Sequence, residues 1–117
     1  MDRVKTYTVN IFTENQIGLL AQISNIFTRR SLSIWNLYAC ATSIEGIHTI
    51  TIVTDATEKR IEEVVFQLEK KVDVVKVYTY DGVRSVNDIL DITLEKVPEV
   101  RCFLKERDME KERILNK

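Results

Sequence analysis

The chain has 117 residues, of which 44% are hydrophobic and 30% are charged, and its 17 basic and 18 acidic side chains leave a net charge of −1. This length suits one compact domain with a short extension, and the balanced charge gives no reason to expect nucleic acid or an anionic membrane as a partner. No apolar run reaches the length of a membrane span, and the charged residues after Met1 do not resemble a secretory signal. We therefore expect a soluble, cytoplasmic protein.

The residues that commonly hold metals or do chemistry are sparse. Cys40 and Cys102 lie outside any CxxC pair, which indicates reduced thiols, although a bridge between them stays open. A single histidine, His48, is poor evidence for a metal site. No serine or cysteine is predicted to lie with a histidine and an acidic residue on loops that would bring their side chains together for catalysis. We expect no metal, no cofactor and no catalytic residue.

Residues 5–12 alternate between apolar and polar side chains, which predicts a strand with one buried face. The side chains on that face are Tyr7, Val9 and Ile11. From residue 18 the apolar period becomes that of a helix. The stripe expected to face the core consists of Leu19, Leu20, Ile23, Ile26 and Phe27.

Residues 33–42 and 47–54 have strand character and are separated by a turn that contains Gly46, so they predict a hairpin. A second amphipathic helix follows, with Ile61 and Leu68 in its apolar stripe. Either Asp55, paired with an acid three residues on, or Thr57 is expected to cap it. Residues 72–80 predict a last strand. Its inward side chains are expected to be Val75 and Val77.

The predicted order is β-α-β-β-α-β, which is typical of an α+β, ferredoxin-like fold with two helices on one face of a four-stranded antiparallel sheet. The opposite face is half polar and needs no cover from the same chain. It is expected to present Thr8, Asn10, Tyr38, Thr49, Thr51, Lys76 and Tyr78. We assign residues 1–81 to this domain and 82–117 to a linker and C-terminal extension, with a further strand at 89–97 and a charged helix or tail at 99–117.

The junction between the first strand and the first helix is the most informative segment for function. The N-terminus of a helix presents unpaired N–H groups and a partial positive charge, which suit a carboxylate. Gly18 lacks the Cβ that would keep a ligand away from the backbone, and Asn15 offers a donor and an acceptor. Two structural explanations stay open: Gly18 relieves crowding between helix and strand, and Asn15 is only an N-cap.

These residues also carry a resemblance. The run Asn15-Gln-Ile-Gly18, followed by Phe27 and Arg30, is similar to the Glu-Asn-x-x-Gly…Phe…Arg pattern of the regulatory subunits of acetolactate synthase. Residues 71–77 resemble the last strand of their ACT domain, where Val-Asp-Val is typical. The match extends over residues 4–80 and implies an ACT domain.

The resemblance implies a non-catalytic subunit that pairs as a homodimer through residues 33–42 and regulates a thiamine-dependent catalytic large subunit by feedback inhibition. The effector would be a branched-chain amino acid, with valine first, held between two chains. The implied effector-binding residues are Asn15, Gln16, Ile17, Gly18 and Leu19 of one chain and Ser33 and Ile34 of the other.

Two departures from the family pattern keep an alternative open. Ser33 and Trp35 stand where the family has asparagine and an acidic residue, and the chain stops soon after what resembles the start of a second domain. A ligand-free ACT module that activates or stabilises a partner enzyme is therefore the second hypothesis. A third is a nucleic-acid-binding sheet with exposed aromatic residues, which the balanced charge disfavours.

Overall fold

The computed structural model describes residues 3–14, 18–42 and 44–84. The elements follow the predicted order, and they are β1 (Lys5–Glu14), α1 (Leu19–Arg29), β2 (Ile34–Ala41), β3 (Ile47–Ala56), α2 (Glu58–Glu69) and β4 (Val74–Asp81). The strand and the helix expected after residue 88 lie outside the described residues.

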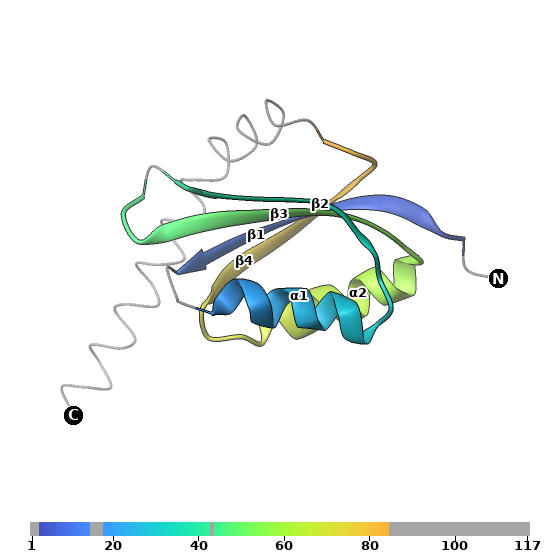
Figure 1. The fold of residues 1–117 in the computed structure, drawn as a ribbon, viewed down its shortest axis with the longest axis horizontal. Coiled ribbons are helices and arrows are strands. Elements are labelled where there is room, and N and C mark those ends of the chain that lie inside the picture. Colours follow the sequence, from blue (N-terminus) through green and yellow to red (C-terminus); the bar gives the residue numbers. More distant parts are fainter. Residues whose placement is uncertain (1–2, 15–17, 43, 85–117) are drawn as a thin grey trace.

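The four strands form one antiparallel sheet in the order β2-β3-β1-β4. Both helices lie on the same face of this sheet (Figure 1). This arrangement confirms the ferredoxin-like prediction, in which two crossovers of the same hand return to one face. It also leaves β2 and β4 at the edges, so that β2 pairs only with β3 in this sheet.

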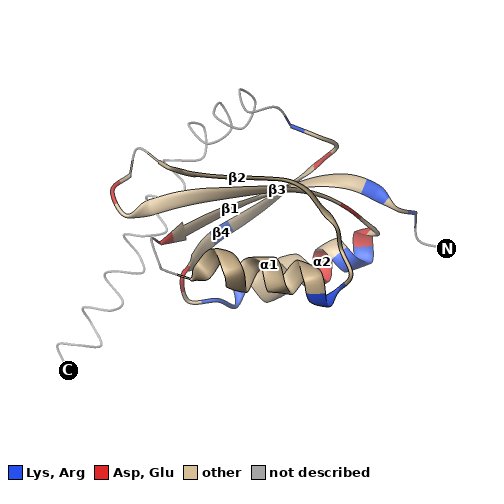
Figure 2. Cartoon of the chain, in the orientation of Figure 1, with Lys and Arg blue, Asp and Glu red and all other residues tan. Residues whose placement is uncertain are grey.

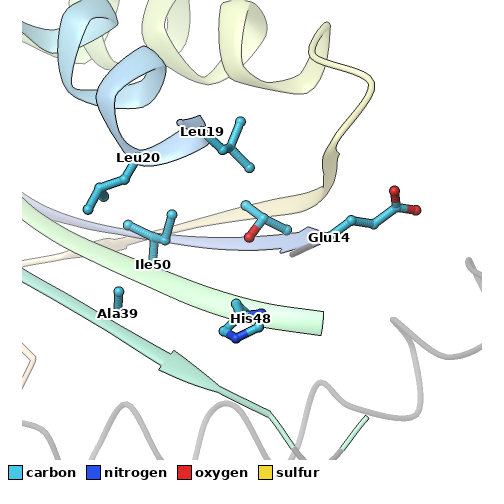
Figure 3. A pocket seen from close by; sticks show the side chains of 7 residues that line it. Glu14, Leu19, Leu20, Ala39, His48 and Ile50 are labelled. Atoms are coloured by element: carbon cyan, nitrogen blue, oxygen red, sulfur yellow. The ribbon is translucent and has the colours of Figure 1, made fainter. Parts of the chain in front are cut away.

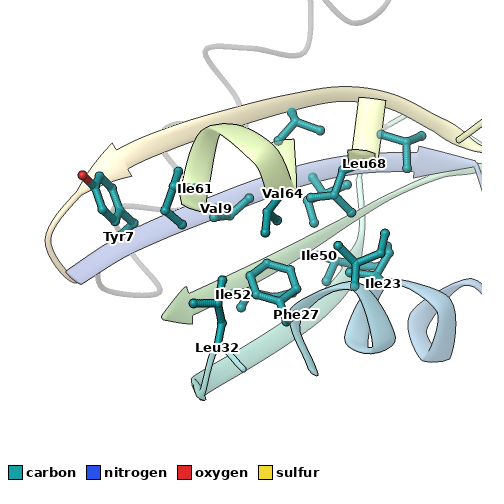
Figure 4. Packing of buried hydrophobic residues seen from close by; sticks show 14 of the residues in the cluster. Tyr7, Val9, Ile23, Phe27, Leu32, Ile50, Ile52, Ile61, Val64 and Leu68 are labelled. Atoms are coloured by element: carbon teal, nitrogen blue, oxygen red, sulfur yellow. The ribbon is translucent and has the colours of Figure 1, made fainter. Parts of the chain in front are cut away.

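The main core fills the space between the helices and the sheet (Figure 4). Val9 of β1, Phe27 of α1 and Val64 of α2 are completely buried there, as the alternation and the helical stripes predicted. Leu20 departs from the predicted stripe, because 42% of its surface is exposed. It lies on the side of α1 that also carries Phe27, but an open cavity lined in part by Ala39 lies next to it.

Two register shifts move residues away from the faces that strict alternation predicts. The shift between Phe12 and Thr13 lets Val75 pack with Phe12 and Ile47 on the helix-free face of the sheet. The prediction that Val75 faces the main core with Val77 is therefore wrong. A second shift lies at the start of β2, between Ile34 and Asn36. Strict alternation along that strand therefore does not determine on which face of the sheet Trp35 lies.

The start of α2 decides between its two predicted caps. Thr57 is the N-cap, and its hydroxyl accepts a hydrogen bond from the backbone N–H of Arg60 at 3.3 Å. Asp55 makes different contacts: its carboxylate accepts hydrogen bonds from the hydroxyl of Thr6 and the indole N–H of Trp35. Thr57 therefore caps the helix, while Asp55 joins three strands.

The helix-free face carries the residues that the sequence placed there, since Asn10 is in register with Thr51 on one side and with Tyr78 on the other. Its central polar residues are nevertheless at most 2% exposed: Thr8, Asn10, Thr49 and Thr51. The hydroxyl of Thr8 donates to the carbonyl of Gly82 at 2.7 Å. Neither amide atom of Asn10 has a hydrogen-bond partner among the described residues.

Candidate functional site

The junction of β1 and α1 forms an uncapped helix N-terminus. Gly18 occupies the N-cap position, no side chain of the described residues caps the helix by a hydrogen bond, and its first turn contains no acidic residue. The N-cap position is thus taken by Gly18, and Asn15, which the sequence also suggested as a cap, lies outside the described residues. The first turn of α1 supplies no carboxylate of its own to the partial positive charge of the first amides, which favours an anion at this end of the helix.

The backbone explains why position 18 is glycine. The φ angle of Gly18 is +86°, in the left-handed region that other residues seldom adopt. A Cβ at this position would meet nothing within 4 Å. Crowding between helix and strand is thus not the reason for the glycine. The left-handed turn is the reason, and it leaves open space at the helix mouth.

A cavity of about 130 Å³ opens beside this helix mouth (Figure 3). Its aliphatic wall is formed by two residues of α1 and two strand residues beneath them: Leu19, Leu20, Ala39 and Ile50. Ala39 belongs to the edge strand β2, where its short side chain leaves room. The volume is below the ~300–1,000 Å³ of sites for drug-sized ligands, so the cavity suits a small metabolite.

Polar groups close the end of the cavity where β1 ends and β3 begins. Thr13, Glu14 and His48 line it, and Thr13 is in register with His48. The Nδ1 atom of His48 is buried and has no hydrogen-bond partner in the part of the chain that the structure describes. The sequence pattern indicated no functional role for His48 beyond its being poor evidence for a metal site. Its position at the start of β3, antiparallel to the end of β1, was the signal that could have placed it near the junction.

The predicted effector-binding residues fall into three groups. Gly18 and Leu19 lie at the helix mouth, and Leu19 lines the cavity. Ser33 and Ile34 lie at the opposite end of β2, where the carbonyl of Ser33 accepts a hydrogen bond from the hydroxyl of Thr54 at 2.6 Å. The remaining three lie outside the described residues: Asn15, Gln16 and Ile17.

Within one chain the two described groups are far apart. Seven residue steps of β2 separate Ile34 from Ala41, which lies at the cavity end and pairs with His48. At about 3.3 Å per residue this is ~23 Å. One chain therefore does not bring Ser33 to Gly18, and their joint role stays a prediction about two chains.

Within residues 3–14, 18–42 and 44–84, no group of three or more His, Cys, Asp or Glu could hold a metal ion. Neither α1 nor α2, with 11 and 12 residues, is long enough to cross a membrane.

Known proteins resemble the chain over the same region. A family model of the AHAS small subunit-like ACT domain matches residues 9–76. The acetolactate synthase small subunit of Mycobacterium bovis is 32% identical over 83 residues, which cover 71% of this chain and 49% of that protein. The probable acetolactate synthase small subunit of Archaeoglobus fulgidus is 28% identical over 95 residues, covering 81% and 60% respectively. The chain thus spans about half the length of the curated relatives it matches.

Solved structures agree with this match. The crystal structure of the acetolactate synthase small subunit from Thermotoga maritima has a TM-score of 0.59 at 27% identity, over 64% of this chain and 47% of that one. The ACT domain from GTP pyrophosphokinase of Chlorobium tepidum also has a TM-score of 0.59, at 17% identity, over 70% of this chain and 92% of that one. At this identity the likeness shows the fold alone. Because the family model covers more than half of the residues, this chain belongs to the family of AHAS small subunit-like ACT domains.

Proposed function

We propose that the chain is a non-catalytic regulatory subunit of acetolactate synthase, which binds a branched-chain amino acid in the cytoplasm and controls a separate catalytic subunit. Valine is the first candidate for the effector. The thiamine-diphosphate chemistry belongs to the catalytic subunit in this proposal. Family membership supports the regulatory role, and the cavity at the start of α1 supports the class of ligand.

The observation that carries the proposal is the pairing of an aliphatic cavity with an uncapped helix N-terminus. The amides at the start of α1 suit the carboxylate of an amino acid. The aliphatic wall, which includes Leu20 and Ile50, suits a branched side chain. The polar end, which includes Thr13 and His48, suits the ammonium group. One small site thus offers a complement to each part of the ligand.

A homodimer completes the proposed site. β2 is an edge strand, and an edge strand gains backbone hydrogen bonds by pairing with a second copy. In an antiparallel pair of β2 strands centred between Leu37 and Tyr38, Ile34 of one chain would stand opposite Ala41 of the other. That register would bring the predicted Ser33 region of one chain to the cavity of its partner, which one chain alone does not achieve.

Effector binding between two chains would control the catalytic subunit through the geometry of the dimer. A ligand that contacts both chains binds one relative orientation better than another, and it shifts the equilibrium by that difference in affinity. A coupling of ~1–3 kcal/mol is typical of such regulation and changes the partner's affinity or activity state about 5- to 150-fold.

A ligand-free interaction module is the second candidate, and the position of Ser33 favours it. Ser33 is exposed, and its short hydroxyl replaces the asparagine of the family pattern. The serine has a shorter reach than the amide and one donor fewer. In this alternative the chain would activate or stabilise the catalytic subunit without sensing an amino acid.

Calorimetric titration of the full chain with valine, leucine and isoleucine separates the two candidates. We expect saturable binding of at least one of them and much weaker binding of valinamide, which keeps the side chain and amine but lacks the carboxylate. If all three amino acids give no heat while the chain still activates the catalytic subunit, the ligand-free module is correct. If valinamide binds as well as valine, the helix mouth does not hold a carboxylate.

A further inference from the structure

A second cavity, of about 280 Å³, lies at the other end of the sheet, around the start of β2. Its lining comes from β1, β2, β3 and the segment after β4, and it consists of Thr6, Trp35, Asn36, Val53, Asp55 and Val83. The register pairs Thr6 with Asp55 and Asn36 with Val53, so these side chains share the helix-free face. This cavity is therefore distinct from the one beside α1.

The cavity is organised around the carboxylate of Asp55. One oxygen accepts a hydrogen bond from the hydroxyl of Thr6 at 2.6 Å, and the other accepts one from the indole N–H of Trp35 at 2.8 Å. These bonds fix the indole although 68% of Trp35 is exposed. An exposed aromatic ring that is already held in place can contact a partner at little further cost in side-chain entropy.

Asp55 has capacity for a further donor. An ionised carboxylate has about four acceptor positions, and the two hydrogen bonds use two of them. Within residues 3–14, 18–42 and 44–84, neither donor to Asp55 is charged and no basic residue forms an ion pair with it. Arg84 follows Val83 in the chain, but its guanidinium lies over the ring of Tyr80, at 5.5 Å from the centroid.

Most of the remaining wall is apolar, since Val53 and Val83 join the indole of Trp35, while Asn36 adds an amide. An apolar wall beside a carboxylate and an aromatic ring complements a side chain with an apolar stem and a cationic end. Arginine fits this combination better than lysine, because its planar guanidinium stacks on an aromatic ring while it donates to a carboxylate.

The β2–β3 hairpin of a second copy paired through β2 does not supply such a cation. In the register described above, Trp35 of one chain would stand opposite Cys40 of the other. Residues 31–58 contain no lysine or arginine, and β2 is tan along its whole length in Figure 2. The paired strands of such a dimer therefore leave the Asp55 carboxylate available to a cation of a different protein.

We propose that the cavity around Asp55 and Trp35 binds an arginine side chain of the catalytic large subunit. This step rests on the proposed function, which supplies that partner. It assigns a role to Trp35, the residue at which the chain departs from the family pattern. The cavity would help to hold the two subunits together, while the cavity beside α1 would hold the effector.

The guanidinium specificity can be tested on the full chain, because Trp35 is its single tryptophan. Titration with N-acetylarginine methylamide should change the Trp35 fluorescence saturably, with a dissociation constant on the order of 10 mM. N-acetylcitrulline methylamide has the same stem without the charge, and it should bind at least about fivefold more weakly. Equal binding of the two compounds would overturn the proposal without any variant.

Two variants extend the test to the partner. Asp55→Asn removes the charge but keeps an acceptor, whereas Glu58→Gln removes an exposed charge of α2 that does not line the cavity. We expect Asp55→Asn alone to weaken binding of the catalytic subunit by at least about fivefold. Equal binding by the parent and Asp55→Asn would overturn the proposal and leave the regulatory role intact. If the parent does not bind the catalytic subunit, the proposed function and this partner both fail, while the arginine titration still decides the ligand class.

Discussion

Substitution of Gly18 by aspartate and by asparagine tests whether the start of α1 holds the effector's carboxylate. The two side chains have nearly the same shape, and both tolerate the left-handed φ of +86° better than other non-glycine residues. Strain of about 1–2 kcal/mol should therefore affect both variants alike. No atom lies within 4 Å of the new Cβ, so neither side chain should disturb the packing.

The two variants should differ in affinity for the effector because only one adds a charge. Like charges ~4 Å apart cost about 1 kcal/mol in water and about 4 kcal/mol where the effective dielectric constant is 20. These energies correspond to a loss of about fivefold to several hundredfold for Gly18→Asp relative to Gly18→Asn. The added charge has the opposite effect on the stability of the fold, because an acid at a helix N-terminus stabilises the helix by about 0.3–1 kcal/mol.

Calorimetry with valine, leucine and isoleucine measures the affinities, and urea unfolding of both variants measures the stabilities. The expected pattern is a Gly18→Asp variant that is at least as stable as Gly18→Asn but binds the effector much more weakly. Equal affinities of the two variants would show that no carboxylate lies at this helix mouth. If neither variant folds, the strain at position 18 exceeds the estimate and the turn is primarily structural.

Three further predictions concern assembly and stability. The full chain should be a dimer by light scattering, and a monomer mass that is independent of concentration would contradict pairing through β2. Asn10→Leu should raise the free energy of unfolding by about 1 kcal/mol or more, because Asn10 is 1% exposed and neither amide atom has a partner within residues 3–14, 18–42 and 44–84; destabilisation would show that the amide has a partner elsewhere. Phe27→Ala should cost about 3–5 kcal/mol, whereas Phe66→Ala, at a residue 62% exposed, should cost less than about 1 kcal/mol in the same urea series.

The sequence predicted the elements well where one physical requirement dominates. Tyr7, Val9 and Ile11 alternate because β1 has the main core on one face, and each of them is buried there. Ile23 and Phe27 recur at helical spacing because α1 lies on the same core. The order of the elements then left few ways to form a sheet with both helices on one face.

The sequence predicted less well where the backbone departs from regular geometry. Val75 lies on the other face than predicted because of a local register shift, and a second shift lies beside Trp35; alternation alone reveals neither. The exposure of Leu20 depends on the cavity beside it, and the place of His48 depends on which strand lies next to β1. These features are set by contacts between distant segments, so one segment of sequence does not contain them.

The open edge of β2 also affects how readily newly made chains aggregate in a cell. Residues 31–44 contain no charged side chain, and natural sheets often protect an open edge with lysine or proline, neither of which occurs there. An uncharged strand with free backbone groups and an exposed tryptophan can add to the edge of other chains and begin an aggregate. Newly made chains that find neither a second copy nor a partner subunit should therefore be lost to aggregation or proteolysis, so that the amount of the subunit follows the amount of its partners.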